Sequence, residues 1–148
     1  NGLWISPHDV EEQVQRVAKQ LKIERHLECF QARRVNKQDA QELVAKCWDL
    51  ATVNQQYLAF HARWQSDLER CSAGVPTGDV THKECFAVRF NLIHEYRDFP
   101  LIDPYLPRSL LPEKWHGEDA TELFHMLHEI LKGPADSYVD QILNTERS

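Results

Sequence analysis

The stretch VNQQYLAFHARWQSDL, residues 53–68, decides the fold of this chain. Its large apolar residues are Val53, Tyr57, Phe60, Trp64 and Leu68. They are separated by four, three, four and four positions. At about 100° per residue these positions fall within a stripe of roughly 80° on a helical wheel. The pattern predicts a long helix with one buried aromatic face.

Helical patterns continue through most of the remaining chain. Asn36 with Asp39, and Thr81 with Glu84, have the spacing of helix N-terminal caps. Further helices are expected over residues 36–48, 81–98, 117–133 and 135–143. Glycines and prolines predict a loop over residues 71–79 and a helix end at Gly133-Pro134, and four prolines interrupt the stretch between residues 99 and 116.

The first 35 residues have a different pattern. A short apolar run at residues 2–6 precedes a helical periodicity from Val10 to Leu21, and residues 25–35 alternate as a strand does. The expected fold class is therefore α+β and mainly α. Residues 1–35 are expected to be a strand-helix-strand remnant, the second half of a ferredoxin-like central domain whose other half lies upstream. Residues 36–148 are expected to form a helical C-terminal domain.

Composition narrows the class of protein. The chain has 148 residues, of which 42% are hydrophobic and 27% charged, as in ordinary globular domains. Neither a membrane span of ~18 apolar residues nor a signal peptide is present. The four cysteines form no CxxC pair, which favours reduced thiols and a cytoplasmic location. A net charge of −6 disfavours DNA binding by this part alone.

No motif predicts catalysis, a cofactor or a metal. Glu122 and His125 have the Glu-x-x-His spacing of di-iron bundles, but a second such pair is missing and both residues are expected to face water. Glycine-rich phosphate loops and nucleophile elbows are absent from the sequence. A cysteine-histidine pair that meets only in space stays open, so an uncharacterised helical-bundle enzyme remains an alternative.

The helix over residues 81–98 carries two arginines in an unusual place. Phe86, Phe90 and Ile93 define an apolar face of this helix, and Arg89 and Arg97 fall within the same arc. A buried guanidinium needs an anionic partner. Either each arginine pairs with a carboxylate such as Asp49, Asp98 or Asp103, or both face a cavity that receives an anion, with His94 beside them.

The C-terminal half resembles the PaaX repressor family. The resemblance is carried by an ordered series of residues, namely His94-Glu95-Tyr96-Arg97-Asp98-Phe99-Pro100, Asp103-Pro104, Leu106-Pro107, Leu110-Leu111-Pro112, Trp115, Gly117, Ala120 and Leu123-Phe124. Two earlier pieces also resemble the family, namely Trp4-Ile5-Ser6-Pro7 and Cys47-Trp48-Asp49-Leu50 with Tyr57.

The resemblance implies a bacterial repressor of phenylacetate breakdown that responds to phenylacetyl-CoA. Its winged helix would bind DNA and is missing here, while the helical domain would dimerise and sense the effector. We expect the phosphates of CoA to meet Arg97, helped by Arg89 and His94, and the aromatic ring to meet Trp48, Tyr57 or Trp64. A homodimerisation module without a ligand site is the other alternative.

Overall fold

The computed structural model describes residues 4, 6, 8–31 and 40–145. The chain divides into two compact units, residues 1–43 and 44–148. The predicted boundary between residues 35 and 36 lies outside the described residues.

The first unit contains helix α1 (Glu11–Leu21) and the 3-10 turn η1 (Glu24–His26). The periodicity from Val10 to Leu21 is thus confirmed as a helix. It ends at Lys22, whose left-handed backbone (φ 58°) places its N–H on the carbonyl oxygen of Lys19.

The expected strand-helix-strand remnant is wrong. The described residues of the first unit contain no strand; of the predicted strands, residues 2, 3, 5 and 32–35 lie outside them. Leu27 has extended backbone angles (φ −119°, ψ 131°), but residues 27–31 form no ladder. Alternating apolar and polar residues favour an extended backbone. A β-strand also requires a neighbouring strand to which it is hydrogen-bonded, and the described residues do not supply one.

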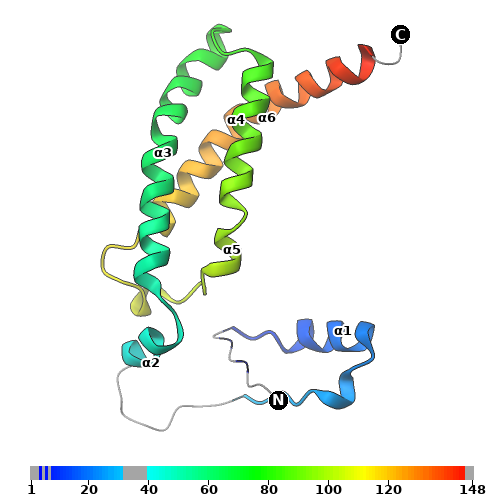
Figure 1. Cartoon of the computed structure of the whole chain (residues 1–148), viewed down its shortest axis with the longest axis vertical. Coiled ribbons are helices and arrows are strands. Elements are labelled where there is room, and N and C mark those ends of the chain that lie inside the picture. The colour runs from blue at the N-terminus through cyan, green and yellow to red at the C-terminus, as the bar shows by residue number, and fades with distance from the viewer. Residues whose placement is uncertain (1–3, 5, 7, 32–39, 146–148) are drawn as a thin grey trace. The chain divides into compact units, whose positions relative to one another are not determined.

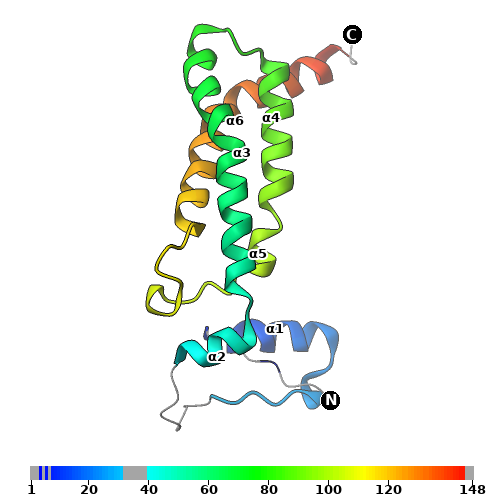
Figure 2. The same cartoon turned by 60° about the vertical axis from the view of Figure 1, so that its left-hand side comes forward.

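The second unit is helical, with elements in the order α2 (Ala40–Cys47, begun in the first unit), α3 (Leu50–Thr77), α4 (His82–Tyr96), α5 (Phe99–Ile102), η2 (Arg108–Leu110) and α6 (Gly117–Thr145). Figure 1 shows α3 and α4 as a hairpin with α6 crossing behind it, and Figure 2 shows the same crossing from another side. Helix α6 packs against both α3 and α4.

The aromatic stripe of residues 53–68 forms the core, as predicted. Tyr57, Phe60 and Trp64 are at most 4% exposed, and Val53 is also buried. They meet the apolar face of α6, where Ala120, Leu123, Leu127 and Leu131 are at most 2% exposed. The prediction that Glu122 and His125 face away from this core is confirmed, since both are exposed.

Two predicted breaks lie inside helices. Helix α3 continues to Thr77 instead of ending in a loop at residue 71. Pro76 in its last turn has no N–H to donate to the carbonyl of residue 72, and the helix ends one residue later. The turn begins at Gly78, which has a left-handed φ of 82°. Helix α6 likewise continues through Pro134. Gly133 permits this because it has no Cβ to clash with the proline ring.

The apolar arc of α4 is turned differently from our prediction. Its buried residues are Cys85 and Leu92, both 0% exposed, whereas Phe86, Phe90 and Ile93 are 38%, 62% and 39% exposed. A helical wheel gives the width of an apolar arc but does not say which part of it a neighbouring helix covers. Here the hydrophobic core covers the side of Cys85 and Leu92, so the phenylalanine side is left accessible.

Candidate functional site

A pocket of about 450 Å³ lies at the end of the helical unit where α3 begins. It is an open pocket bordered by α3, by the connection between α5 and α6, and by the first three turns of α6. Its lining residues are Tyr57, Asp103, Tyr105, Leu106, Leu111, Trp115, Gly117, Glu118, Thr121, Glu122 and His125. The walls are thus aromatic and aliphatic, and the charged side chains are acidic.

Tyr57 links the pocket to the helical core. Its ring stacks on Phe99 at 4.2 Å between centroids and meets Trp115 edge-on at 5.6 Å. Its hydroxyl donates a hydrogen bond of 2.8 Å to Oδ2 of Asp103. Burial, reinforced by this hydrogen bond and the charge of Asp103, raises the pKa of Tyr57 far above its usual value. Tyr57 therefore remains a neutral donor at physiological pH.

The connection from Asp103 to His116 is held in place by polar contacts. Asn54 of α3 donates from Nδ2 to the carbonyl oxygen of Lys114 (2.6 Å), and its Oδ1 accepts from the N–H of His116 (2.7 Å). The guanidinium of Arg108 donates to the carbonyl oxygens of Pro112 and Glu113, both at 2.6 Å. These hydrogen bonds take the place of the backbone hydrogen bonds that a helix or a sheet would provide. They hold the connection, which forms one wall of the pocket, in a defined conformation.

Tyr105 is the unusual residue of this wall. It has a left-handed backbone (φ 50°), which costs energy for a bulky residue. Its N–H donates to Oδ1 of Asp103 at 2.7 Å, and this bond fixes the conformation. The side chain is 55% exposed, which leaves the ring accessible at the pocket.

The effector residues that we predicted do not gather at one place. Tyr57 lines the pocket, whereas the described lining does not include the other five. Trp64 is a core residue, and its Nε1 donates to Oε2 of Glu95 at 2.9 Å. Trp48 is half-buried against the hydrophobic core.

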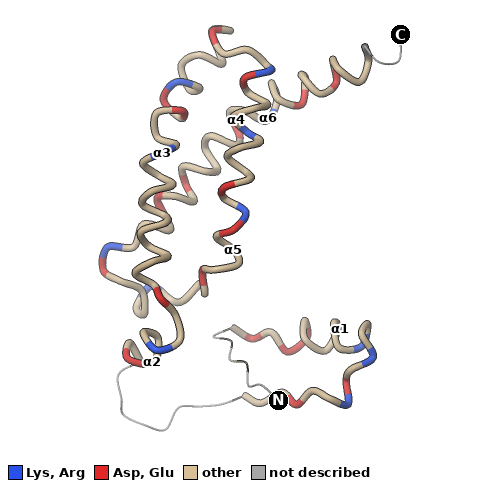
Figure 3. Tube along the Cα trace, viewed as in Figure 1, with Lys and Arg blue, Asp and Glu red and all other residues tan. Residues whose placement is uncertain are grey.

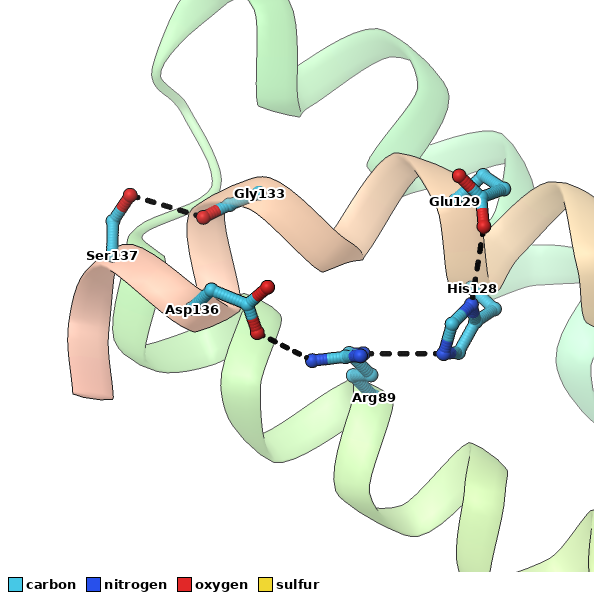
Figure 4. Close-up of polar contacts among 6 residues, drawn as sticks. All are labelled: Arg89, His128, Glu129, Gly133, Asp136 and Ser137. Carbon is cyan, nitrogen blue, oxygen red and sulfur yellow. Dashed lines mark hydrogen bonds and ion pairs between the residues drawn. The ribbon is translucent and has the colours of Figure 1, made fainter. Parts of the chain in front are cut away.

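Arg89 has internal partners (Figure 4). One guanidinium nitrogen lies 2.8 Å from Oδ1 of Asp136, and Nε donates to Nε2 of His128 at 3.4 Å. The Arg89 side chain is 23% exposed, and these contacts tie α4 to α6. Its anionic partner is thus a residue of α6 that the helical wheel did not indicate.

Arg97 and His94 lie on the accessible side of α4. Placing Arg97 on a core-facing arc was wrong, because its side chain is 62% exposed and its nearest described carboxylate is Asp98, at 3.6 Å. His94 is exposed and stacks on Phe90 at 6.3 Å between ring centroids. Neither arginine is paired with Asp49 or Asp103 in the described contacts.

Sequence reasoning did not identify Asp103, Tyr105 and Trp115 as pocket residues. The stretch between residues 99 and 116 has no periodicity from which the direction of a side chain is predictable. One signal was present: Asp103-Pro104 is a turn pair, and an aspartate at such a position often accepts from the N–H two residues later. Asp103 does so with Tyr105.

Other site types find no support in the described part. Its histidines, cysteines and acidic residues form no group of three or more that could hold a metal ion. Its four cysteines are free thiols, with Cys71 and Cys85 buried. None of its helices combines the length and apolar character needed to cross a membrane.

Comparison with known proteins defines the class. Residues 48–141 match the family described as the PaaX-like protein C-terminal domain, and residues 1–44 match the PaaX protein central Cas2-like domain. The chain is therefore of the class in which a Cas2-like domain precedes a helical C-terminal domain. It belongs to the PaaX family, as its sequence pattern predicted.

The chain is similar to the transcriptional repressor PaaX of Escherichia coli (strain K12), with 25% identity over 143 residues. The alignment covers 95% of this chain and 45% of the repressor, so the chain spans somewhat less than half of that relative's length. No solved structure matches the chain significantly.

Proposed function

We propose that this chain is the effector-sensing and dimerisation part of a PaaX-type transcriptional repressor of phenylacetate catabolism. In this proposal it is cytoplasmic and not an enzyme, phenylacetyl-CoA is the effector, and a winged-helix domain outside this chain binds DNA. Membership of the PaaX family and similarity to a transcriptional repressor support the regulatory role. The acidic net charge of −6 supports the assignment of DNA binding to another part.

The pocket at Tyr57 is the observation that carries the sensing role. A volume of about 450 Å³ lies within the range of small-molecule sites, and its walls of Tyr57, Leu111 and Trp115 suit a phenyl ring. Thr121 also lines the pocket, and its hydroxyl is held by the carbonyl oxygen of Gly117 at 2.7 Å and the hydroxyl of Tyr96 at 2.9 Å. The ring of phenylacetyl-CoA would enter this pocket while the CoA part stays outside.

Arg97 remains our proposed partner for the CoA phosphates. Its guanidinium is 62% exposed and held only by a loose 3.6 Å contact with Asp98, so it is available to a phosphate. Arg89 and His94 were proposed as helpers. Arg89 would have to exchange Asp136 for a phosphate, so its contribution to affinity should be smaller than that of Arg97.

Calorimetric titration of the chain with phenylacetyl-CoA and with free CoA tests the sensing role. We expect phenylacetyl-CoA to bind more tightly, because free CoA leaves the aromatic pocket empty. Leu111→Trp, which fills the pocket, and Arg97→Ala should each weaken binding about ten- to a hundredfold without a large change in melting temperature. Arg16→Ala, an exposed arginine of α1, is the control. Equal binding of the two ligands would contradict the proposal.

The accessible face of α4 supports the dimerisation role. Phe86, Phe90 and Ile93 form an apolar surface on one side of this helix, and Phe90 is 62% exposed. Phe86 stacks with Phe90 at 6.4 Å and contacts Tyr138 of α6 at 5.6 Å, which extends the surface onto a second helix. An exposed apolar patch of this kind marks an interaction surface, and a second copy of the chain is the proposed partner.

Sedimentation velocity at several concentrations tests the dimer. The parent chain should sediment as a dimer, and Phe90→Asp should convert it to a monomer because a carboxylate would be buried at the interface without a partner. Leu58→Asp is the matched control, since Leu58 is 48% exposed on α3. A monomeric parent, or a dimeric Phe90→Asp variant, would refute this surface as the dimer contact.

A further inference from the structure

The pocket has a one-sided charge. Its described lining contains the carboxylates of Asp103, Glu118 and Glu122, one histidine (His125), and no lysine or arginine. Asp103 is engaged by the Tyr57 hydroxyl and the Tyr105 N–H. Glu118 and Glu122 are exposed, and no ion pair to either is found among the described residues. These two carboxylates therefore give the pocket lining a net negative charge.

Helix stability does not account for both glutamates. Glu118 belongs to the first turn of α6, where an acidic side chain is favourable near the positive end of the helix dipole. Glu122 lies one turn further, where this benefit has decayed, and it is four residues from Glu118. Like charges at this spacing lie on the same face and repel. The pair thus costs the helix stability while it adds negative charge to the pocket.

This charge has opposite consequences for a free acid and a thioester. With a phenyl ring in this pocket, the carboxylate of phenylacetate would lie one carbon from the ring, beside the glutamates. Like charges about 6 Å apart in partly solvated surroundings weaken binding by roughly ten- to a hundredfold. A thioester has no charge at that position. Its CoA phosphates lie at the far end of the pantetheine arm, beyond the screening length of about 8 Å.

We infer that Glu118 and Glu122 make the pocket selective for the neutral acyl group of a thioester and exclude the corresponding free acid by charge. The inference rests on the proposed function, because it assumes that the pocket holds the aromatic acyl end of the effector. It assigns a specificity role to two residues of α6 that make no other described contact. A repressor with this pocket would respond to the CoA thioester and not to the free acid.

Three ligands separate the effect of ligand charge from that of ligand shape. Phenylacetate and phenylacetamide have nearly the same shape and differ in charge, and phenylacetyl-CoA is the full effector. Ligand-observed NMR titration suits the weak binding of the two small compounds, and calorimetry suits the thioester. The proteins are the parent, the double variant Glu118→Gln/Glu122→Gln, and Glu129→Gln. Glu129 is the matched control because it lies two turns beyond Glu122 on α6 and outside the described pocket lining.

We expect the parent to bind phenylacetamide at least about tenfold more tightly than phenylacetate. The double variant should recover most of that difference by binding phenylacetate more tightly, with phenylacetamide unchanged within about twofold and Glu129→Gln equal to the parent. Equal binding of the acid and the amide by the parent would overturn the inference, as would a double variant that keeps the parent's discrimination.

The two hypotheses fail in different ways. If phenylacetyl-CoA binds and Leu111→Trp blocks it, but the glutamates do not affect phenylacetate, only the selectivity is lost. If phenylacetyl-CoA and phenylacetamide both fail to bind the parent, the sensing pocket is lost and the selectivity with it.

Discussion

Gly117 occupies a position in which a side chain would disturb the floor of the pocket. A Cβ built on Gly117 would overlap Nε1 of Trp115 and lie 3.1 Å from Cε2 of Tyr57. Both rings are buried and in mutual contact, so neither moves freely. The first residue of α6 must therefore be small for the pocket to keep its shape.

Gly117→Ala should consequently destabilise the protein and weaken ligand binding together. Overpacking of a buried site costs typically about 1–3 kcal/mol, and displacement of Trp115 should remove a wall of the pocket. Urea unfolding and titration with phenylacetyl-CoA measure the two effects. Asp119→Ala, in the same helix turn with a side chain that is 63% exposed, should change stability by only about 0.5 kcal/mol. A Gly117→Ala variant as stable as the parent would show that Trp115 relaxes freely.

Single side chains show where sequence reasoning about the site reached its limit. The stripe on α3 identified Tyr57 because helical periodicity fixes the direction of each side chain in a long helix. The partner of Arg89 was not predictable in the same way. Asp136 is 47 residues away, and the pairing depends on the crossing of α4 and α6, which no local pattern specifies.

At the scale of the elements, the ion pair of Arg89 and Asp136 joins α4 to α6. Arg89 and Asp136 come from the two helices, and their atoms lie 2.8 Å apart with the arginine largely shielded. The pair of Arg97 and Asp98 is an internal comparison, because it is longer (3.6 Å) and both side chains are more than 60% exposed. Shielding and geometry are the properties that make an ion pair contribute to stability.

Double-mutant cycles to alanine should separate the two pairs. We expect a coupling free energy of about 0.5–1 kcal/mol for Arg89 and Asp136, and about 0 for Arg97 and Asp98. Chemical denaturation of each single and double variant supplies the free energies of unfolding. Equal coupling in the two pairs would mean that Arg89 does not stabilise the contact between α4 and α6. Such a result would favour a role for Arg89 in ligand binding.

The start of α4 predicts a dependence of stability on pH. Thr81 donates to Oε2 of Glu84 through its hydroxyl (2.6 Å) and its N–H (2.8 Å), which completes a capping box. These hydrogen bonds lower the pKa of Glu84 below its usual 4.5. Because the pKa is lower in the folded state, the stabilisation is present above about pH 4.5 and is lost as the pH falls through the folded-state pKa.

Glu84→Gln should therefore flatten the acid side of the stability curve. Urea unfolding at pH 6 and at about pH 3 measures the free energy of unfolding on both sides of the transition. The parent should lose more stability between these values than the variant. Thr81→Ser keeps the hydroxyl donor and should behave as the parent does. If Glu84→Gln and the parent lose stability equally, the carboxylate does not contribute through the cap.

Elements defined by periodicity were predictable, whereas their ends were less so. The core faces of α3 and α6 followed from the spacing of their apolar residues. Gly74, Pro76 and Gly133-Pro134 suggested breaks, yet both helices continue through them. At Gly74 the missing side chain permits close packing instead, because a Cβ there would lie 2.6 Å from Cγ2 of Val80. Gly74 thus marks a close contact between α3 and the turn that follows it, and not the end of the helix.

At the scale of the whole molecule, the distribution of charge indicates whether this chain can bind DNA by itself. Figure 3 shows the basic residues of the helical unit scattered singly among acidic ones. Helix α6 is the extreme case, with six acidic residues and Lys132 as its single basic one. Association with duplex DNA gains most of its free energy from displaced counterions, which requires basic residues gathered on one face. The helical unit, within the described residues, offers no such gathering.

This chain should therefore not bind an operator duplex with sequence preference on its own. Fluorescence anisotropy at about 0.15 M salt, with an operator duplex and a scrambled duplex of equal length, measures both affinity and specificity. We expect weak and equal binding of the two duplexes, with no gain on adding phenylacetyl-CoA. The transcriptional repressor PaaX of Escherichia coli, which has more than twice the aligned length, serves as the positive control. Submicromolar, sequence-dependent binding by this chain would instead place a DNA contact within the Cas2-like or helical domain, and the assignment of operator recognition to a separate winged helix would have to be abandoned.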